Sequence, residues 1–199
     1  MQERMRPTKR RLIAFEKRVA AAFKAKKVKG PIHLAGGNED ALLSIFQNIS
    51  DGEWVFSTYR SHYHALLHGI PEKWLMAEIL AGRSMSIHSL GHRFMSSAIV
   101  GGMLPIAVGA AAGLLRGGKR EMVHCFVGDM AATTGAFHEA VKYAEGHRLP
   151  IRFYIEDNGM SCDTPTDETW GAGLDGTVRV ERYDYARIYP HSGIGKYVF

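Results

Sequence analysis

The segment from residue 123 to residue 160 predicts two buried strands joined by a helix. Val123–Val127 and Ile151–Ile155 are short apolar runs rich in β-branched and aromatic residues, which is typical of buried strands. Thr133 or Thr134 can cap the intervening helix. The apolar stripe of that helix is formed by Ala136, Ala140, Val141 and Ala144. This succession predicts an α/β fold in which helices flank a parallel sheet.

Polar residues follow both predicted strands. Gly128-Asp129 ends the first strand, and Glu156-Asp157-Asn158-Gly159 ends the second. Because the carboxyl ends of parallel strands meet at one edge of a sheet, we expect Asp129 and Asn158 to lie close together, where α/β sheets bind ligands. Carboxylate, amide and main-chain oxygens suit Mg²⁺, which often bridges to phosphates. The alternative is an ordinary βαβ unit, because polar residues are common in turns.

The same residues resemble a cofactor signature. Gly128-Asp129 and, after the helix, Glu156-Asp157-Asn158 are similar to the thiamine diphosphate motif, usually written GDG and later NN. The residues between these two motifs, from Gly135 to Glu156, resemble the alpha subunits of 2-oxo acid dehydrogenases of the pyruvate and branched-chain types. The resemblance implies the thiamine diphosphate-binding fold. Met130 stands where the family usually has Gly, and a turn with positive φ would disfavour it.

Two further phrases resemble this family. Thr58-Tyr59-Arg60-Ser61-His62 is similar to its Tyr-Arg-Ala-His phrase, and an Arg fork beside a Tyr hydroxyl suits a diphosphate. Ile99-Val100-Gly101, followed by Pro105 and a Gly/Ala-rich helix, resembles the family segment that packs against a partner subunit. The resemblance implies that the Ala98 carbonyl and the Val100 amide hold the aminopyrimidine ring, with the Val100 side chain supporting the bent cofactor.

These resemblances define a predicted site. The implied metal ligands for Mg²⁺ are Asp129, Asn158 and the carbonyl of Met160. The implied cofactor-binding residues are Tyr59, Arg60, Ala98, Val100, Gly128, Asp129, Met130, Ala131, Asn158 and Met160. Three histidines, His33, His62 and His88, are candidates for binding the substrate carboxylate or transferring protons, with His33 the first choice. A zinc site at His62, His64 and His68 is disfavoured because no cysteine accompanies them.

Charge is concentrated at the N-terminus. Residues 1–30 hold eleven Lys/Arg and two acidic residues, a net charge of +9, whereas the remaining residues carry a net −4. Apolar residues recur at helical spacing in this segment at Leu12, Phe15, Val19 and Phe23. We therefore interpret it as an amphipathic helix over Thr8–Lys27 rather than as a surface for nucleic acid or a membrane. The predicted organisation is a basic N-terminal helix, 1–29, and a thiamine diphosphate-binding domain, 30–199, within a single domain overall.

Phe94–Leu115 carries no charge and is long enough to span a membrane. Its serines, Pro105 and alanine-rich composition favour a loop over Ser96–Gly102 and a buried helix over Leu104–Leu115 instead. Other patterns predict strands at Trp54–Ser57 and Thr177–Tyr183, and helices at Ala41–Ile49, with Asn38 as N-cap, and at Pro71–Ala81.

Cysteine content and the N-terminus bear on the compartment. Cys125, in a predicted strand, and Cys162, in a turn, offer no disulfide framework. The charged N-terminus lacks an apolar core, so we expect no signal peptide. Both observations predict a cytoplasmic protein.

The resemblance implies oxidative decarboxylation of a 2-oxo acid. It covers about residues 30–165 and only the diphosphate-binding half, so we expect a beta-type partner in an α₂β₂ assembly to supply the activating glutamate. The family loop that closes over the diphosphate is expected to be absent or replaced, and residues 189–199 have no family counterpart. Two alternatives stay open: the N-terminal half of a split transketolase-like enzyme, and a non-catalytic binding paralogue.

Overall fold

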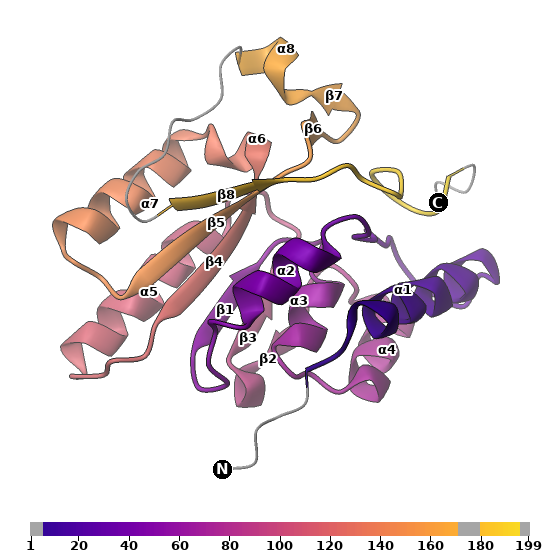
Figure 1. The fold of residues 1–199 in the computed structure, drawn as a ribbon, viewed down its shortest axis with the longest axis horizontal. Coiled ribbons are helices and arrows are strands. Elements are labelled where there is room, and N and C mark those ends of the chain that lie inside the picture. The colour runs from indigo at the N-terminus through magenta and orange to yellow at the C-terminus, as the bar shows by residue number, and fades with distance from the viewer. Residues whose placement is uncertain (1–5, 171–179, 196–199) are drawn as a thin grey trace.

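The computed structural model describes residues 6–170 and 180–195, and its core is a six-stranded sheet in the order β2-β3-β1-β4-β5-β8 (Figure 1). The strands are β1 (Trp54–Ser57), β2 (His88–Ser89), β3 (Phe94–Ser96), β4 (Val123–Gly128), β5 (Ile151–Asp157) and β8 (Val180–Asp184). All neighbours pair in parallel except β2 and β3, which are antiparallel. This confirms the predicted α/β fold, and β4 and β5 lie side by side as the βαβ unit requires.

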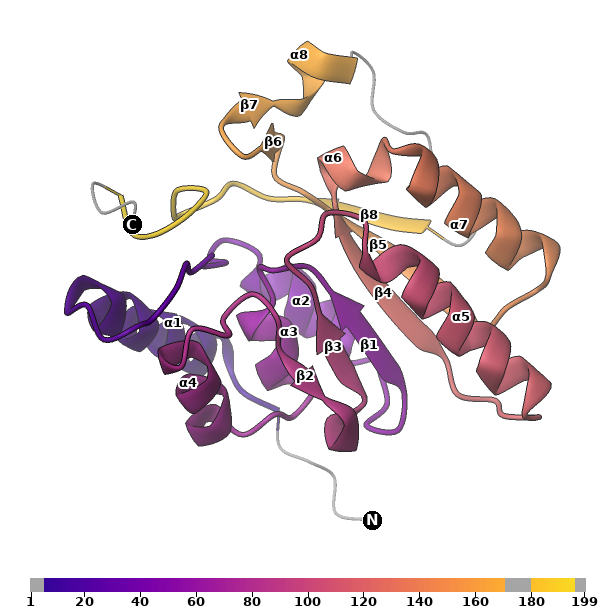
Figure 2. The same cartoon turned by 180° about the vertical axis from the view of Figure 1, so that it is seen from behind.

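Helices cover both faces of the sheet, as Figures 1 and 2 show from opposite sides. One layer consists of α1 (Lys9–Lys24), α2 (Glu39–Phe46), α3 (His62–Leu67) and α4 (Glu72–Leu80). The other consists of α5 (Met103–Arg116) and α7 (Gly135–Gly146). The short elements are the 3₁₀ turn η1 (Leu90–His92), α6 (Asp129–Ala132), the hairpin β6 (Met160–Ser161) and β7 (Thr164–Pro165), and α8 (Thr166–Trp170).

Alternate residues of the central strands fill two separate cores. Phe126 of β4 and Tyr154 of β5 pack against the layer of α1 to α4. Cys125 and Phe153, their sequence neighbours, pack against α5 and α7. Successive side chains of a strand point to opposite faces, and here both faces are covered. This explains why β4 and β5 are apolar runs rather than alternating ones.

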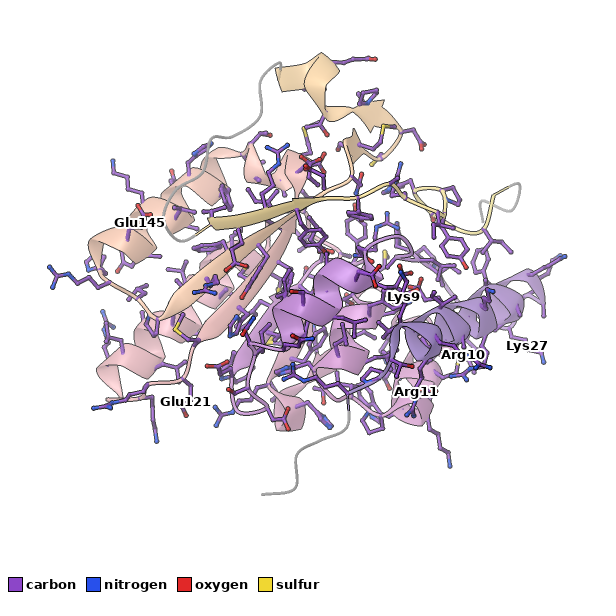
Figure 3. All side chains as sticks on the ribbon, viewed as in Figure 1. Lys9, Arg10, Arg11, Lys27, Glu121 and Glu145 are labelled. Carbon is purple, nitrogen blue, oxygen red and sulfur yellow. The ribbon has the colours of Figure 1, made fainter. Side chains whose placement is uncertain are left out.

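The basic N-terminal segment belongs to the fold. Leu12, Phe15 and Val19 are fully buried, which confirms the amphipathic helix. The carboxylate of buried Glu16 accepts a hydrogen bond from the Ala35 amide at 2.9 Å and ties α1 to the loop before α2. The helix ends at Lys24, shorter than predicted. Figure 3 shows the basic side chains gathered along α1.

The structure decides between the two predicted caps of the βαβ helix and corrects one residue of its apolar stripe. Thr134, not Thr133, is the N-cap, and its hydroxyl accepts a hydrogen bond from the Phe137 amide. Ala136 is exposed, and Phe137 takes its place in the buried stripe. Phe137 precedes Ala140, Val141 and Ala144 at helical spacing, so it lies on the same face, and its ring packs edge-on against Phe153 with centroids 5.8 Å apart.

The other predicted elements differ from the structure mainly at their ends. β1 has its predicted bounds, α5 begins one residue early, and α4 lies inside the predicted range. Residues 177–179 of the predicted last strand lie outside the described residues, and β8 covers Val180–Asp184. In the described ranges, 6–170 and 180–195, no helix combines the length and the apolar character needed to cross a membrane.

Candidate active site

A cleft lies at the carboxyl ends of β1, β4 and β5 and holds about 820 Å³ of space, part of it open to solvent. This is the edge at which parallel α/β sheets bind ligands. The side chains and backbone that line the cleft belong to Ser57–Arg60, Ser97, Ile99–Gly101, Met103, Leu104, Phe126–Ala131, Glu156, Asn158, Met160–Cys162, Tyr185, Arg187 and His191.

Asp129 begins α6 directly after β4 and is 7% exposed. Burial raises the pKa of its carboxyl above the usual range, the hydrogen bond from the Thr166 hydroxyl partly offsets this, and the nearby negative charge of Asp157 raises the pKa further. In the part of the chain that the structure describes, Asp129 forms no ion pair with a basic side chain. Its hydrogen-bond partners, the Thr166 hydroxyl and main-chain amides, are neutral, and a buried carboxylate with neutral partners is suited to receive a cation.

Asn158 and Met160 follow β5 and face the same cleft. The Asn158 side chain is held at both ends: Oδ1 accepts the Met160 amide at 3.1 Å, and Nδ2 donates to the Tyr185 hydroxyl at 3.3 Å. Met160 pairs across the β6–β7 hairpin with Pro165. Because proline has no N–H to donate, this pairing leaves the Met160 carbonyl without a donor from the facing residue.

These oxygens fit a hard divalent cation that also has non-protein ligands. One carboxylate, one amide oxygen and one main-chain carbonyl are the donor types that Mg²⁺ takes. Among the described residues there is no group of three or more His, Cys, Asp or Glu side chains that could hold a metal alone. A metal at this edge would therefore need phosphate oxygens and water to complete its shell, which is how Mg²⁺ is usually bound beside phosphates.

Tyr59 and Arg60 follow β1, the neighbour of β4, and line the same cleft as Asp129. Arg60 is 7% exposed, and its guanidinium donates to the carbonyls of Leu34 and of His191. Two of its five donors are thereby used, and the group stays fixed and charged. Burial raises the pKa of Tyr59, which keeps its hydroxyl protonated and able to donate.

Met130 does not disturb the signature. It lies within α6, and it is not among the non-glycine residues with positive φ in the described part of the chain, which are Lys26, Arg93, Arg148 and Cys162. The positive-φ turn that would disfavour methionine is therefore not present at this position. A helical backbone accepts Met without strain, and its amide donates to the Asp129 carboxyl.

His33 lies behind the cleft wall rather than on it. Its ring packs against Tyr59 and His191, with centroids 4.5 and 5.0 Å away, and both of those residues line the cleft. His33 is 7% exposed, and its Nδ1 has no hydrogen-bond partner among the described residues. Burial, followed by the positive charge of Arg60, lowers the pKa of His33 to about 3.

We expect His33 to stay neutral across the physiological range. A depressed histidine pKa means that the folded protein rejects the proton that the unfolded chain would bind, so the ring charges only well below its ordinary value near 6.5. NMR of the ring signals should show no titration of His33 between about pH 8 and pH 5. Disappearance of that signal in His33→Gln assigns it, and a midpoint near 6.5 would contradict the expected neutral ring.

The other two candidate histidines are not brought to the cleft, which corrects their predicted position. His62 is fully buried, with Nε2 2.9 Å from the Ser84 hydroxyl and Nδ1 3.4 Å from Glu16. His88 is exposed on β2, with Nε2 3.0 Å from the Ser96 carbonyl. His62 begins a helix whose buried side faces α1. Within the Tyr-Arg-x-His phrase, Tyr59 and Arg60 therefore line the cleft, whereas His62 lies in the core.

Nine of the ten predicted cofactor-binding residues line the cleft, and Ala98 does not. Ala98 is exposed in the turn before α5, while its neighbours Ser97 and Ile99 line the cleft. The nine residues share one cleft in the structure. Their contacts with a cofactor stay a prediction.

Comparison with known proteins identifies the family of this chain. A family model described as dehydrogenase E1 component matches residues 7–172. The chain belongs to the dehydrogenase E1 component family. This confirms the resemblance to alpha subunits of the thiamine diphosphate-dependent 2-oxo acid dehydrogenases, and the matched range includes α1.

Three relatives of this E1 family chain are alpha subunits. The alpha subunit of acetoin:2,6-dichlorophenolindophenol oxidoreductase from Cupriavidus necator is 31% identical over 90% of this chain and 60% of its own length. Its counterpart from Bacillus subtilis is 29% identical over 88% of this chain and 58% of its own. The pyruvate dehydrogenase E1 component subunit alpha of Porphyra purpurea is 32% identical over 72% of this chain and 47% of its own. The E1 family chain thus spans between 47% and 60% of these relatives.

Sequence reasoning missed the segment that follows β8. Tyr185, Arg187 and His191 line the cleft, although this part of the E1 family chain lies beyond the range that the family model matches. The Arg187 guanidinium donates to the Cys162 carbonyl at 3.0 Å and links the segment to the β6–β7 hairpin. Because β8 is parallel to β5, the residues after it emerge at the same edge. Recognising 177–183 as a parallel strand would have predicted this.

Proposed function

We propose that this chain binds thiamine diphosphate with Mg²⁺ in the cleft, as the alpha-type subunit of an enzyme that oxidatively decarboxylates a 2-oxo acid. One observation carries the proposal: Asp129, Asn158 and Met160 share a cleft with Tyr59 and Arg60. The membership of the E1 family and the names of its alpha-subunit relatives support the same assignment.

Each part of the cleft lining is proposed to bind a different part of the cofactor. Asp129, Asn158 and the Met160 carbonyl would hold the metal beside the diphosphate. Arg60 and the Tyr59 hydroxyl would donate to diphosphate oxygens, since both are donors at neutral pH. The amide of Ala131 completes this set at the beginning of α6. Ile99, Val100 and Leu104 offer an apolar wall where the organic part of the cofactor would rest.

The proposed chemistry combines the bound cofactor with two histidines that stay neutral. When bound, thiamine diphosphate supplies a nucleophilic carbon and an electron sink for decarboxylation. His33, kept neutral by burial and by Arg60, offers a hydrogen-bond donor and an acceptor behind Tyr59 rather than a fixed positive charge. His191 lies between His33 and the cleft, and burial followed by Arg60 lowers its pKa as well. Both imidazoles are therefore available in the neutral form.

The site is proposed to be completed by a second chain. The activating glutamate of thiamine enzymes would come from a beta-type subunit in an α₂β₂ assembly. The cleft of this chain opens beside Ile99 and Val100, which are 73% and 61% exposed. Apolar side chains so exposed at the rim of a ligand cleft are typical of a surface that another chain covers.

Calorimetric titration tests the proposal. The full chain should bind thiamine diphosphate saturably when Mg²⁺ is present, and chelation of the metal with EDTA should abolish the heat signal, because the diphosphate is held through the metal. Thiamine, which lacks the diphosphate, is the matched control and should bind far more weakly. Co-expression with a beta-type subunit should then give 2-oxo acid-dependent reduction of 2,6-dichlorophenolindophenol. A chain that binds no thiamine diphosphate under either condition would be a non-catalytic paralogue, and turnover of ketose phosphates instead of 2-oxo acids would make it transketolase-like.

A further inference from the structure

The β6–β7 hairpin brings a hydroxyl to the proposed metal ligand. Met160 pairs with Pro165 and Ser161 with Thr164, and the turn between them includes Cys162 at a φ of 55°. The chain thus doubles back, and the Thr166 amide donates to the Gly159 carbonyl at 3.0 Å. The main chain alone closes this hairpin.

The Thr166 side chain makes a contact that the hairpin itself does not require. Its hydroxyl donates to Oδ2 of Asp129, 37 positions earlier in the chain. Asp129 lies in α6, whereas Asn158 and Met160 lie at the base of the hairpin that Thr166 ends. The hydrogen bond therefore connects the two halves of the proposed metal site, and it occupies one of the two oxygens of the carboxylate.

We propose that Thr166 is a positioning residue that restricts Asp129 to one metal-facing oxygen and so makes the cleft prefer Mg²⁺ to Ca²⁺. This inference rests on the proposed function of the cleft. Mg²⁺ requires a near-ideal octahedron at about 2.0–2.1 Å, in which a carboxylate contributes one oxygen. Ca²⁺ accepts carboxylates with both oxygens and tolerates a larger, irregular shell. A hydroxyl bound to Oδ2 leaves Oδ1 for the metal and opposes the two-oxygen geometry.

Thr166→Val removes the hydroxyl and keeps the branched shape of the side chain. Calorimetric titration of the full chain with thiamine diphosphate, at saturating Mg²⁺ and separately at saturating Ca²⁺, measures both the affinity and the preference. The variant should lose about ten-fold or more of its affinity with Mg²⁺, the loss expected for one hydrogen bond to a charged group. With Ca²⁺ the loss should be smaller, so the Mg²⁺/Ca²⁺ affinity ratio should fall.

Two further variants make the test specific. Thr166→Ser keeps the hydroxyl and should restore the wild-type ratio. Thr164→Val makes the same chemical change on an exposed residue of the same hairpin and should leave the ratio unchanged. Thermal unfolding of each variant shows whether the fold is intact.

Two results would overturn the inference and leave the proposed function standing. An equal loss with both metals would make Thr166 a structural anchor of the hairpin, and unchanged affinities would make its hydrogen bond irrelevant to the metal. If the wild-type chain binds thiamine diphosphate with neither metal, the proposed function fails, and the inference fails with it.

Discussion

Asp129→Ala should abolish Mg²⁺-dependent binding of thiamine diphosphate, with a loss of about a hundred-fold or more in affinity. Mutations of residues that merely support metal ligands already cost about 10–100-fold. Asp129 contributes the single carboxylate of the proposed ligand set, and neutral oxygens from Asn158 and Met160 cannot replace its charge. Asp129→Asn should fail similarly, because it preserves the shape but not the charge.

The same change should not weaken the fold. The pKa of Asp129 is raised, so keeping this carboxyl ionised at neutral pH costs folding free energy, and that cost grows as pH rises above the carboxyl's unfolded pKa. Removing the carboxyl removes the cost. We therefore expect the thermal midpoint of the ligand-free Asp129→Ala variant at neutral pH to equal or exceed that of the wild type.

A matched control separates the metal site from general charge. Asp163 is an exposed carboxylate in the turn of the β6–β7 hairpin, and Asp163→Ala should bind thiamine diphosphate as the wild type does. Calorimetric titration at saturating Mg²⁺ measures all three variants. Wild-type affinity in Asp129→Ala would show that the metal assignment is wrong.

Phe126→Ala should lower the free energy of unfolding by about 3–5 kcal/mol, as removal of a buried aromatic ring does. Phe126 is fully buried in β4 and stacks on Tyr154, 4.5 Å between centroids, and on Phe46, 5.6 Å. His64 contacts its edge at 4.4 Å. The ring therefore joins the central strands to α2 and α3, and alanine would leave a cavity that these elements cannot fill without moving.

Urea denaturation of the full chain measures this loss. Tyr143→Ala is the control, because Tyr143 is an aromatic residue that is 47% exposed on α7. Its replacement should change the free energy of unfolding by less than about 0.5 kcal/mol. A loss below about 1 kcal/mol in Phe126→Ala would mean that the elements around Phe126 collapse into the space.

Parts of the fold follow from local patterns. The apolar runs of β4 and β5 and the helix between them are visible in the sequence because burial on both faces excludes polar residues. Sequence patterns do not predict β2, β3, β6 and β7, since elements of two or three residues are too short to show a period. They form because neighbouring segments supply their hydrogen-bond partners: beside β3, the Val55 amide of β1 donates to the Arg93 carbonyl, and the Ser57 carbonyl accepts from the Ser97 amide.

The histidines show the limit of motif reasoning at the site. His62 stands two positions after Arg60, which lines the cleft, yet its side chain is directed to Glu16 and Ser84. The start of α3 turns it away, and its buried partners come from α1 and from the turn after α4. Residue type and proximity in sequence could not distinguish a histidine at the cleft from a histidine in the core.

The sequence by itself determined the βαβ unit and, through it, that Asp129 and Asn158 meet at one edge of the sheet. Both facts depend on short-range patterns and on the parallel pairing that a helical connection imposes. Only the tertiary structure decided that Thr166 reaches Asp129 and that the His191 carbonyl holds Arg60, contacts that span 37 and 131 positions. Such contacts depend on the path of the chain after β5 and β8, which no local period records, because it is set by packing against elements distant in sequence.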